Sequence, residues 1–169
     1  MTDSGVGGKP ADRSRLATEH ASGDDSPGLL LWQVTNRWQS AQRSALKPFG
    51  LTHVQFVLLA SLAWLDTGEP VTQRQLADHA ATDPMMTSQV VRVLEQRLLV
   101  RRSGHPVDKR AVAVAVTDAG ADLANRANFA VEACDRDFFA VLGPGLADFA
   151  AALRTVRDSG GWRTDPPRG

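Results

Sequence analysis

The composition of the chain lacks features that several classes of protein require. Its 169 residues include one cysteine and no tyrosine, and 19 acidic residues balance 19 lysines and arginines. A lone cysteine, Cys134, excludes an intramolecular disulfide and any cysteine-rich metal site. We find no apolar run that approaches a membrane span and no signal-peptide core near the N-terminus. We therefore expect a cytoplasmic protein with no membrane partner.

Motifs of the common enzyme classes are also missing. The four histidines, His20, His53, His79 and His105, share no metal-ligand spacing. We find no glycine-rich phosphate loop, no G-x-S-x-G sequence and no paired carboxylates. We therefore expect neither an enzyme nor a metal or cofactor. Hydrophobic residues form 43% of the chain, which is enough for the core of one domain.

The most informative stretch runs from Thr72 to Val116. Thr72 and Gln75 form a capping box that predicts the start of a helix, which ends near Ala80. Asp83 and Pro84 then predict a second start, because aspartate caps free N–H groups and proline suits the first helical position. The sequence therefore predicts two helices joined by a tight turn.

The second of these helices has two faces. An apolar face recurs at helical spacing and should point inward: Thr87, Val90, Val91, Leu94 and Leu98. A polar face carries small and hydrogen-bonding side chains and one cation: Met85, Ser88, Gln89, Arg92 and Gln96. Such an outer face suits a recognition helix that enters a major groove.

Two short strands, 99–102 and 111–116, follow the helices. The loop between them, 103–110, contains a glycine, a proline and the pair Lys109-Arg110. Alone, this loop is equally well an ordinary basic surface loop or a projecting wing that touches DNA. Its position directly after two tightly joined helices favours the wing. The pattern therefore predicts a mainly α fold of the α+β winged helix type.

Charge is unevenly distributed despite the zero total. Between Thr72 and Arg110 there are seven lysines and arginines against four acids, so the remainder of the chain is acidic by the same margin. A positive face on a negative body is what a protein that binds a nucleic-acid duplex can use.

The stretch resembles the MarR family of bacterial transcription regulators. The matching segments are Leu76-Ala77-Asp78, 90–95, 99–102, Asp108-Lys109-Arg110, Val116-Thr117 and Gly120. The resemblance implies a DNA-binding dimer in which Arg110 enters the minor groove and Asp108 holds that arginine. Two departures stand out. Leu98 replaces a common glycine, which predicts a looser helix exit, and Met85 and Met86 replace small polar residues.

From the pattern and the resemblance together we predict a DNA contact set. In it Met85, Ser88, Gln89 and Arg92 read the major groove, while Arg74, Arg101 and Lys109 contact phosphates. The full set is Arg74, Asp83, Met85, Thr87, Ser88, Gln89, Arg92, Arg101, Asp108, Lys109 and Arg110.

The rest of the chain predicts helices on both sides of the winged helix. We expect flexible tails at 1–27 and 159–169 and one domain at 28–158. Its DNA-binding core would be 51–117, and the flanking helices 28–47 and 118–158 would form a dimerisation region. A second capping box, Thr52 and Gln55, opens an apolar central helix. A homodimer would require a near-palindromic operator in double-stranded DNA.

The resemblance also implies a pocket for a small-molecule effector, often a phenolic or aromatic acid. Trp32, Asn36, His53 and Phe56 are the candidate lining residues, and they are equally well core residues. Family members that sense peroxide use a thiol in the first helix, where this chain has none. A packed Cys134 is therefore favoured over a redox role.

These observations predict a dimeric, sequence-specific transcription regulator, a repressor that a small molecule releases. The alternative is a winged helix that docks a protein and does not bind specific DNA. A neutral or acidic outer face on the second helix would favour that alternative.

Overall fold

The computed structural model describes residues 16–66 and 68–159. Most of the two expected tails, 1–15 and 160–169, therefore lies outside the described residues. The chain divides into two compact units, Met1–Arg37 and Trp38–Gly169.

The first unit contains one turn of 3-10 helix, η1 (Gly23–Asp25), and the beginning of helix α1 (Pro27–Leu46). The end of the expected tail is therefore helical, and α1 starts two residues before the apolar pattern does. The apolar side chains on this part of α1 are exposed: Leu29, Leu30, Leu31, Trp32 and Val34.

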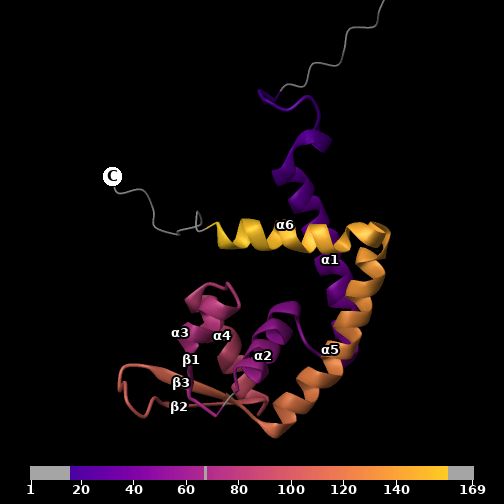
Figure 1. Cartoon of the computed structure of the whole chain (residues 1–169). Helices are drawn as coiled ribbons and strands as arrows, with labels where there is room; N and C mark the ends of the chain where they lie inside the picture. Colours follow the sequence, from indigo (N-terminus) through magenta and orange to yellow (C-terminus); the bar gives the residue numbers. More distant parts are fainter. Residues whose placement is uncertain (1–15, 67, 160–169) are drawn as a thin grey trace, which may run out of the picture. The chain divides into compact units, whose positions relative to one another are not determined.

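The second unit is a winged helix followed by two further helices (Figure 1). In chain order its elements are the end of α1, η2 (Lys47–Phe49), α2 (His53–Leu65), β1 (Val71–Thr72), α3 (Gln73–His79), α4 (Pro84–Gln96), β2 (Val100–Gly104), β3 (Val112–Val116), α5 (Asp118–Phe139), η3 (Ala140–Gly145) and α6 (Leu146–Asp158). The strands form one antiparallel sheet in the order β1-β3-β2. Val71 pairs with Val114, and Arg102 pairs with the same residue from the other side.

Helix α2 forms the centre of the core, as its apolar sequence predicts. Its capping box is present, with the Thr52 side chain accepting from the Gln55 N–H and Gln55 bonding back to Thr52. Leu58, Leu59 and Leu62 are fully buried. Trp64, the residue before the last of the helix, is the exception and is 81% exposed.

Both helices of the helix-turn-helix end in the same way. After α3, the Ala81 and Thr82 N–H groups bond to the Asp78 and Ala77 carbonyls. After α4, the Leu98 and Leu99 N–H groups bond to the Glu95 and Leu94 carbonyls. This pair of bonds is the Schellman motif, which places one residue in the left-handed region.

That residue is usually glycine, yet here it is Ala81 (φ 50°) and Leu98 (φ 60°). The expectation of a loose exit at Leu98 is wrong, because both Schellman bonds form. The expectation that Leu98 faces inward is also wrong. In the left-handed region its side chain leaves the buried face of α4 and is 77% exposed.

The turn after α4 contacts Thr117 and the first turn of α5. The Thr117 N–H donates to the Leu99 carbonyl at 3.1 Å, and the Thr117 hydroxyl donates to the Leu98 carbonyl at 2.8 Å. Gly120 packs so closely that a Cβ there would lie 2.0 Å from the Leu99 carbonyl oxygen. Any side chain at position 120 would therefore push α5 away from the winged helix.

The last two helices are separated by a sharp bend. By length and composition alone, the stretch Asp118–Asp158 could cross a membrane, although the sequence shows no apolar run that predicts a span. Gly143 has φ 49° and ψ −126°, which breaks the stretch into α5 and a 13-residue α6. Because a span needs about 20 apolar residues, α6 is too short. Helix α5 carries seven charged residues.

Backbone strain at Leu98 leads to a first prediction. Leu98→Gly should be more stable than Leu98→Ala by about 1 kcal/mol, because glycine adopts a positive φ without a Cβ clash. Urea unfolding at fixed protein concentration measures the difference. Both variants remove the same exposed side chain, so equal stabilities would show that the left-handed backbone at this position carries no strain.

Candidate nucleic-acid interface

The outer face of α4 is open to solvent, as the sequence pattern predicts. Met85 is 72% exposed, and Gln89, Arg92 and Gln96 are exposed too, while Ser88 is half-buried. Val91 and Leu94, on the opposite face, are completely buried. Met86 is 39% exposed, so neither methionine at the start of the helix is fully buried in the core.

Thr87 does not belong to this face, which corrects its place in the predicted contact set. Its side chain is 0% exposed and its hydroxyl donates to the Asp83 carbonyl at 2.9 Å. Thr87 Oγ1 also lies 2.8 Å from Thr82 Oγ1, within the turn that joins the two helices. Thr87 therefore fixes the angle between α3 and α4, and its side chain is closed to a ligand.

Asp83 caps the recognition helix. Its carboxylate accepts hydrogen bonds from the Met85 and Met86 N–H groups, both at 2.9 Å. The side chain is exposed, but its charge is directed at the helix terminus. The structure thus gives Asp83 a positioning role, and its contact with DNA stays a prediction.

Two of the seven cations in this stretch are engaged within the fold. Arg102 makes a two-point contact with Glu95, with Nε at 2.7 Å and Nη2 at 2.6 Å from Oε2. Hydrogen bonds from Arg102 hold the pKa of Glu95 below its usual range. Arg97 Nη1 donates to the Gly50 carbonyl at 2.9 Å. The predicted contact set leaves out both cations, but their partners Gly50 and Glu95 were not predicted.

The remaining five cations are exposed and form no ion pair within residues 16–66 and 68–159: Arg74, Arg92, Arg101, Lys109 and Arg110. All five belong to the predicted contact set. They come from α3, α4, β2 and the loop between β2 and β3, which are the elements of the winged helix itself.

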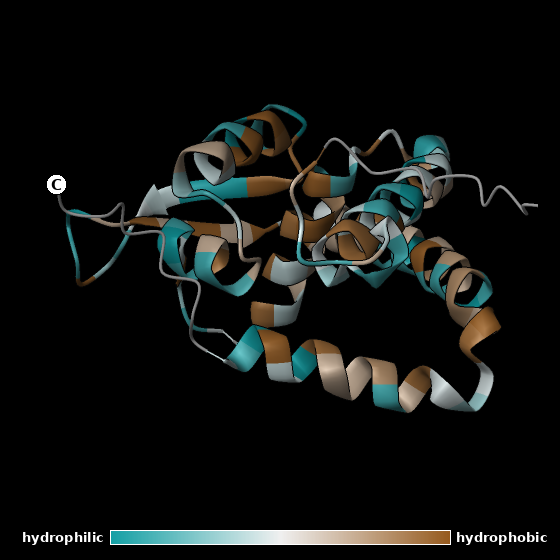
Figure 2. Ribbon diagram, turned by 90° about the horizontal axis from the view of Figure 1, so that it is seen from above, coloured by the Kyte–Doolittle hydropathy of each residue, from teal (hydrophilic) through white to brown (hydrophobic). Residues whose placement is uncertain are grey.

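The loop between β2 and β3 projects beyond α3 and α4 and is largely hydrophilic at its tip (Figures 1 and 2). His105 Nδ1 accepts from the Val107 and Asp108 N–H groups at 3.3 and 3.0 Å. Asp108 Oδ1 accepts from the backbone N–H of Arg110 at 2.9 Å. Asp108 therefore orders the backbone of Arg110, and its contact with the guanidinium, which the resemblance implies, stays a prediction.

The four candidate effector residues belong to different units. Trp32 and Asn36 are exposed on the first part of α1, where the Asn36 amide donates to the Trp32 carbonyl at 2.8 Å. In the second unit Phe56 is buried in the core cluster, and its place in an effector pocket stays a prediction. His53 is half-buried and packs edge-to-face on Trp38, with ring centroids 5.0 Å apart.

A part-buried polar cluster lies next to His53, and no sequence signal predicted it. Asp135 accepts from Trp38 Nε1 at 2.7 Å and from Gln42 Nε2 at 2.6 Å, which joins α1 to α5. Burial lowers the pKa of His53, Asp135 opposes that shift, and Arg43 adds to it.

Cys134 is half-buried next to this cluster, and burial with Asp135 and Asp137 raises the pKa of its thiol. A raised pKa disfavours the reactive thiolate, which agrees with the packed interpretation. Within the described part of the chain, no three histidine, cysteine, aspartate or glutamate side chains gather closely enough to hold a metal ion.

Comparison with known proteins places this geometry in a family. Residues 51–112 match the model described as the MarR family. The chain is 47% identical over 116 residues to the uncharacterized HTH-type transcriptional regulator YdcH of Bacillus subtilis, covering 68% of this chain and 79% of that protein. It is 33% identical over 135 residues to the HTH-type transcriptional repressor Rv2887 of Mycobacterium tuberculosis, covering 79% and 95%.

Solved structures agree with the sequence relatives. A transcriptional regulator of the MarR family from Rhodococcus sp. RHA1 superimposes with a TM-score of 0.74 at 28% identity, covering 83% of this chain and 98% of that one. CouR from Rhodococcus jostii RHA1, solved with bound p-coumaroyl-CoA, gives a TM-score of 0.73 at 25% identity, covering 85% and 100%. The helix-turn-helix, the wing and these matches together show that the chain belongs to the MarR family of transcription regulators, which are not enzymes.

Proposed function

We propose that the protein binds double-stranded DNA in a sequence-specific way and represses transcription. The observation that carries this proposal is the exposed, unpaired set of five cations on the winged helix, next to the open polar face of α4. Met85, Ser88, Gln89 and Arg92 would read base edges in the major groove. Rv2887 is named a transcriptional repressor, which supports repression over activation for this protein.

Each cation has a role in this proposal. Arg74, Arg101 and Lys109 would contact phosphates, which positions the protein without reading sequence. Arg110 would enter the minor groove from the loop whose backbone Asp108 orders. A small-molecule effector would release the repressor by binding better to a state that cannot hold DNA. CouR, with its bound p-coumaroyl-CoA, supports an aromatic ligand of this kind.

The test of this function is the capture of sheared genomic DNA by the purified protein at near-physiological salt, followed by sequencing. A few enriched intergenic fragments that share a near-palindrome are expected. Uniform weak retention that disappears with added salt would reflect backbone electrostatics alone. That result would favour the alternative function, a winged helix that docks another protein.

The wing contact gives a second prediction. Arg110→Ala should weaken binding to an enriched fragment by about 1–3 kcal/mol, because the minor-groove contact is lost. Fluorescence anisotropy with labelled DNA measures the affinity. Arg126→Ala removes another exposed arginine, from α5, and should leave the affinity unchanged. If the two variants bind equally well, Arg110 makes no contact with DNA.

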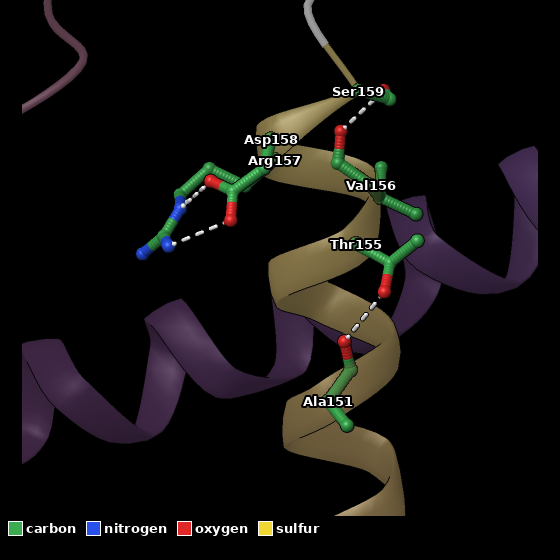
Figure 3. A network of polar contacts seen from close by, with 6 residues as sticks. All are labelled: Ala151, Thr155, Val156, Arg157, Asp158 and Ser159. Carbon is green, nitrogen blue, oxygen red and sulfur yellow. Dashed lines mark hydrogen bonds and ion pairs between the residues drawn. The ribbon is translucent and has the colours of Figure 1, made fainter.

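We also propose that the protein acts as a homodimer that uses α6. Helix α6 has no buried residue, and its apolar side chains Leu146, Leu153 and Val156 are exposed. Figure 3 shows that the polar contacts at its end stay within the helix, where Arg157 pairs with Asp158. Val156 projects from the other side of the helix. An apolar helix face of this kind is typical of a subunit interface.

This proposal gives a third prediction. The double variant Leu153→Glu/Val156→Glu should sediment as a monomer at micromolar concentration, because a dimer would have to bury two unpaired charges. Sedimentation velocity distinguishes the two states. Leu98→Glu places one such charge at another exposed leucine and should remain dimeric. If the double variant sediments with the mass of the wild type, α6 does not form the dimer interface.

A further inference from the structure

The backbone N–H groups in the first turn of α4 are all occupied. Pro84 has no N–H group. The N–H groups of Met85 and Met86 both donate to the Asp83 carboxylate at 2.9 Å, and that of Thr87 donates to the carbonyl of the same aspartate at 2.8 Å. Free groups of this kind let many helix N-termini hold a phosphate. Because a carboxylate already fills this terminus, the start of α4 does not favour contact with the DNA backbone.

The side chains at the same end of α4 are apolar. Met85 and Met86 are both exposed. Met85 shares the outer face of the helix with Gln89 and Arg92, which follow it at helical spacing. An apolar side chain therefore stands at the N-terminal end of the face that would enter a major groove.

B-DNA presents only one apolar group in its major groove. The edges of guanine, adenine and cytosine carry hydrogen-bond donors and acceptors, whereas thymine adds its 5-methyl group. A thioether over a polar base edge would leave donors and acceptors without partners, which costs free energy. Over a thymine methyl group the same side chain removes apolar surface from water on both molecules.

We propose that Met85 is a specificity-determining residue that reads the 5-methyl group of a thymine. Gln89 lies one turn further along the same face, and its amide fits the N6 and N7 edge of adenine. The two side chains together select neighbouring A·T pairs in each half of the operator. This inference rests on the proposed function and states which base the recognition helix requires.

The charges near Met85 favour DNA over a hydrophobic protein partner. Arg92 lies on the same face of α4, and Arg74 comes from α3, which the tight turn joins to α4. Both arginines are exposed, and neither forms an ion pair within residues 16–66 and 68–159. A base edge flanked by phosphates satisfies the apolar group and the cations together.

Deoxyuridine provides the direct test, because it differs from thymidine by this methyl group alone. An enriched genomic fragment is amplified once with dTTP and once with dUTP. Fluorescence anisotropy then measures the affinity of the full-length protein for each copy. The uracil copy should bind about fourfold more weakly for each methyl group in contact, which is the effect of burying one such group. Equal affinities for the two copies would overturn the proposal.

Variants of Met85 separate this contact from effects of uracil on the DNA itself. Met85→Ala should bring the ratio of the two affinities close to one, because alanine cannot reach the methyl group. Met85→Leu keeps an apolar side chain and should retain most of the ratio. Leu98→Ala shortens an exposed side chain outside the predicted contact set and should show the wild-type ratio. A wild-type ratio in Met85→Ala contradicts the assignment.

The outcomes also distinguish this inference from the proposed function. If no genomic fragment is enriched, the regulator and its base readout are both refuted. If a fragment is enriched and uracil leaves the affinity unchanged, the regulator stands and Met85 does not read thymine. Amplified DNA contains no 5-methylcytosine. A fragment that loses its affinity on amplification with dTTP would therefore assign the methyl group to methylcytosine and refute thymine as its source.

Discussion

The arrangement of α4, the sheet and α5 depends most on the contact between the turn after α4 and the start of α5. Two consecutive carbonyls, at Leu98 and Leu99, accept hydrogen bonds from Thr117. Gly120 allows α5 to approach the same backbone at a distance that no side chain would permit. Since β2 starts at the next residue, this junction sets the direction of the recognition helix, the sheet and α5 together.

Much of this fold could be predicted because its signals are local. The capping boxes at Thr52 and Thr72 and the cap at Asp83 each act within three residues, and all are present in the structure. Such signals are visible in sequence because the chain supplies both partners of each bond within one turn.

Other features depend on contacts between distant residues, and these could not be predicted. Arg97 and Arg102 look the same in sequence as Arg92, but the fold uses them to bind Gly50 and Glu95. The bonds from Trp38 and Gln42 to Asp135 join positions more than 90 residues apart. The helical spacing also predicted Leu98 on the inner face of α4. That prediction assumes that the helix continues to Leu98, whereas α4 ends at Gln96.

The exposed face of α4 is separate from its buried face, and this separation affects how the protein can evolve. Met85, Gln89 and Arg92 project into solvent, whereas Val91 and Leu94 supply the packing of the same helix. Exchange of an exposed residue away from such packing usually alters stability by no more than about 0.5 kcal/mol. Substitutions on the outer face therefore change the contacts of this surface at little cost in stability, and a duplicated copy of the gene could acquire a new target without losing a stable fold.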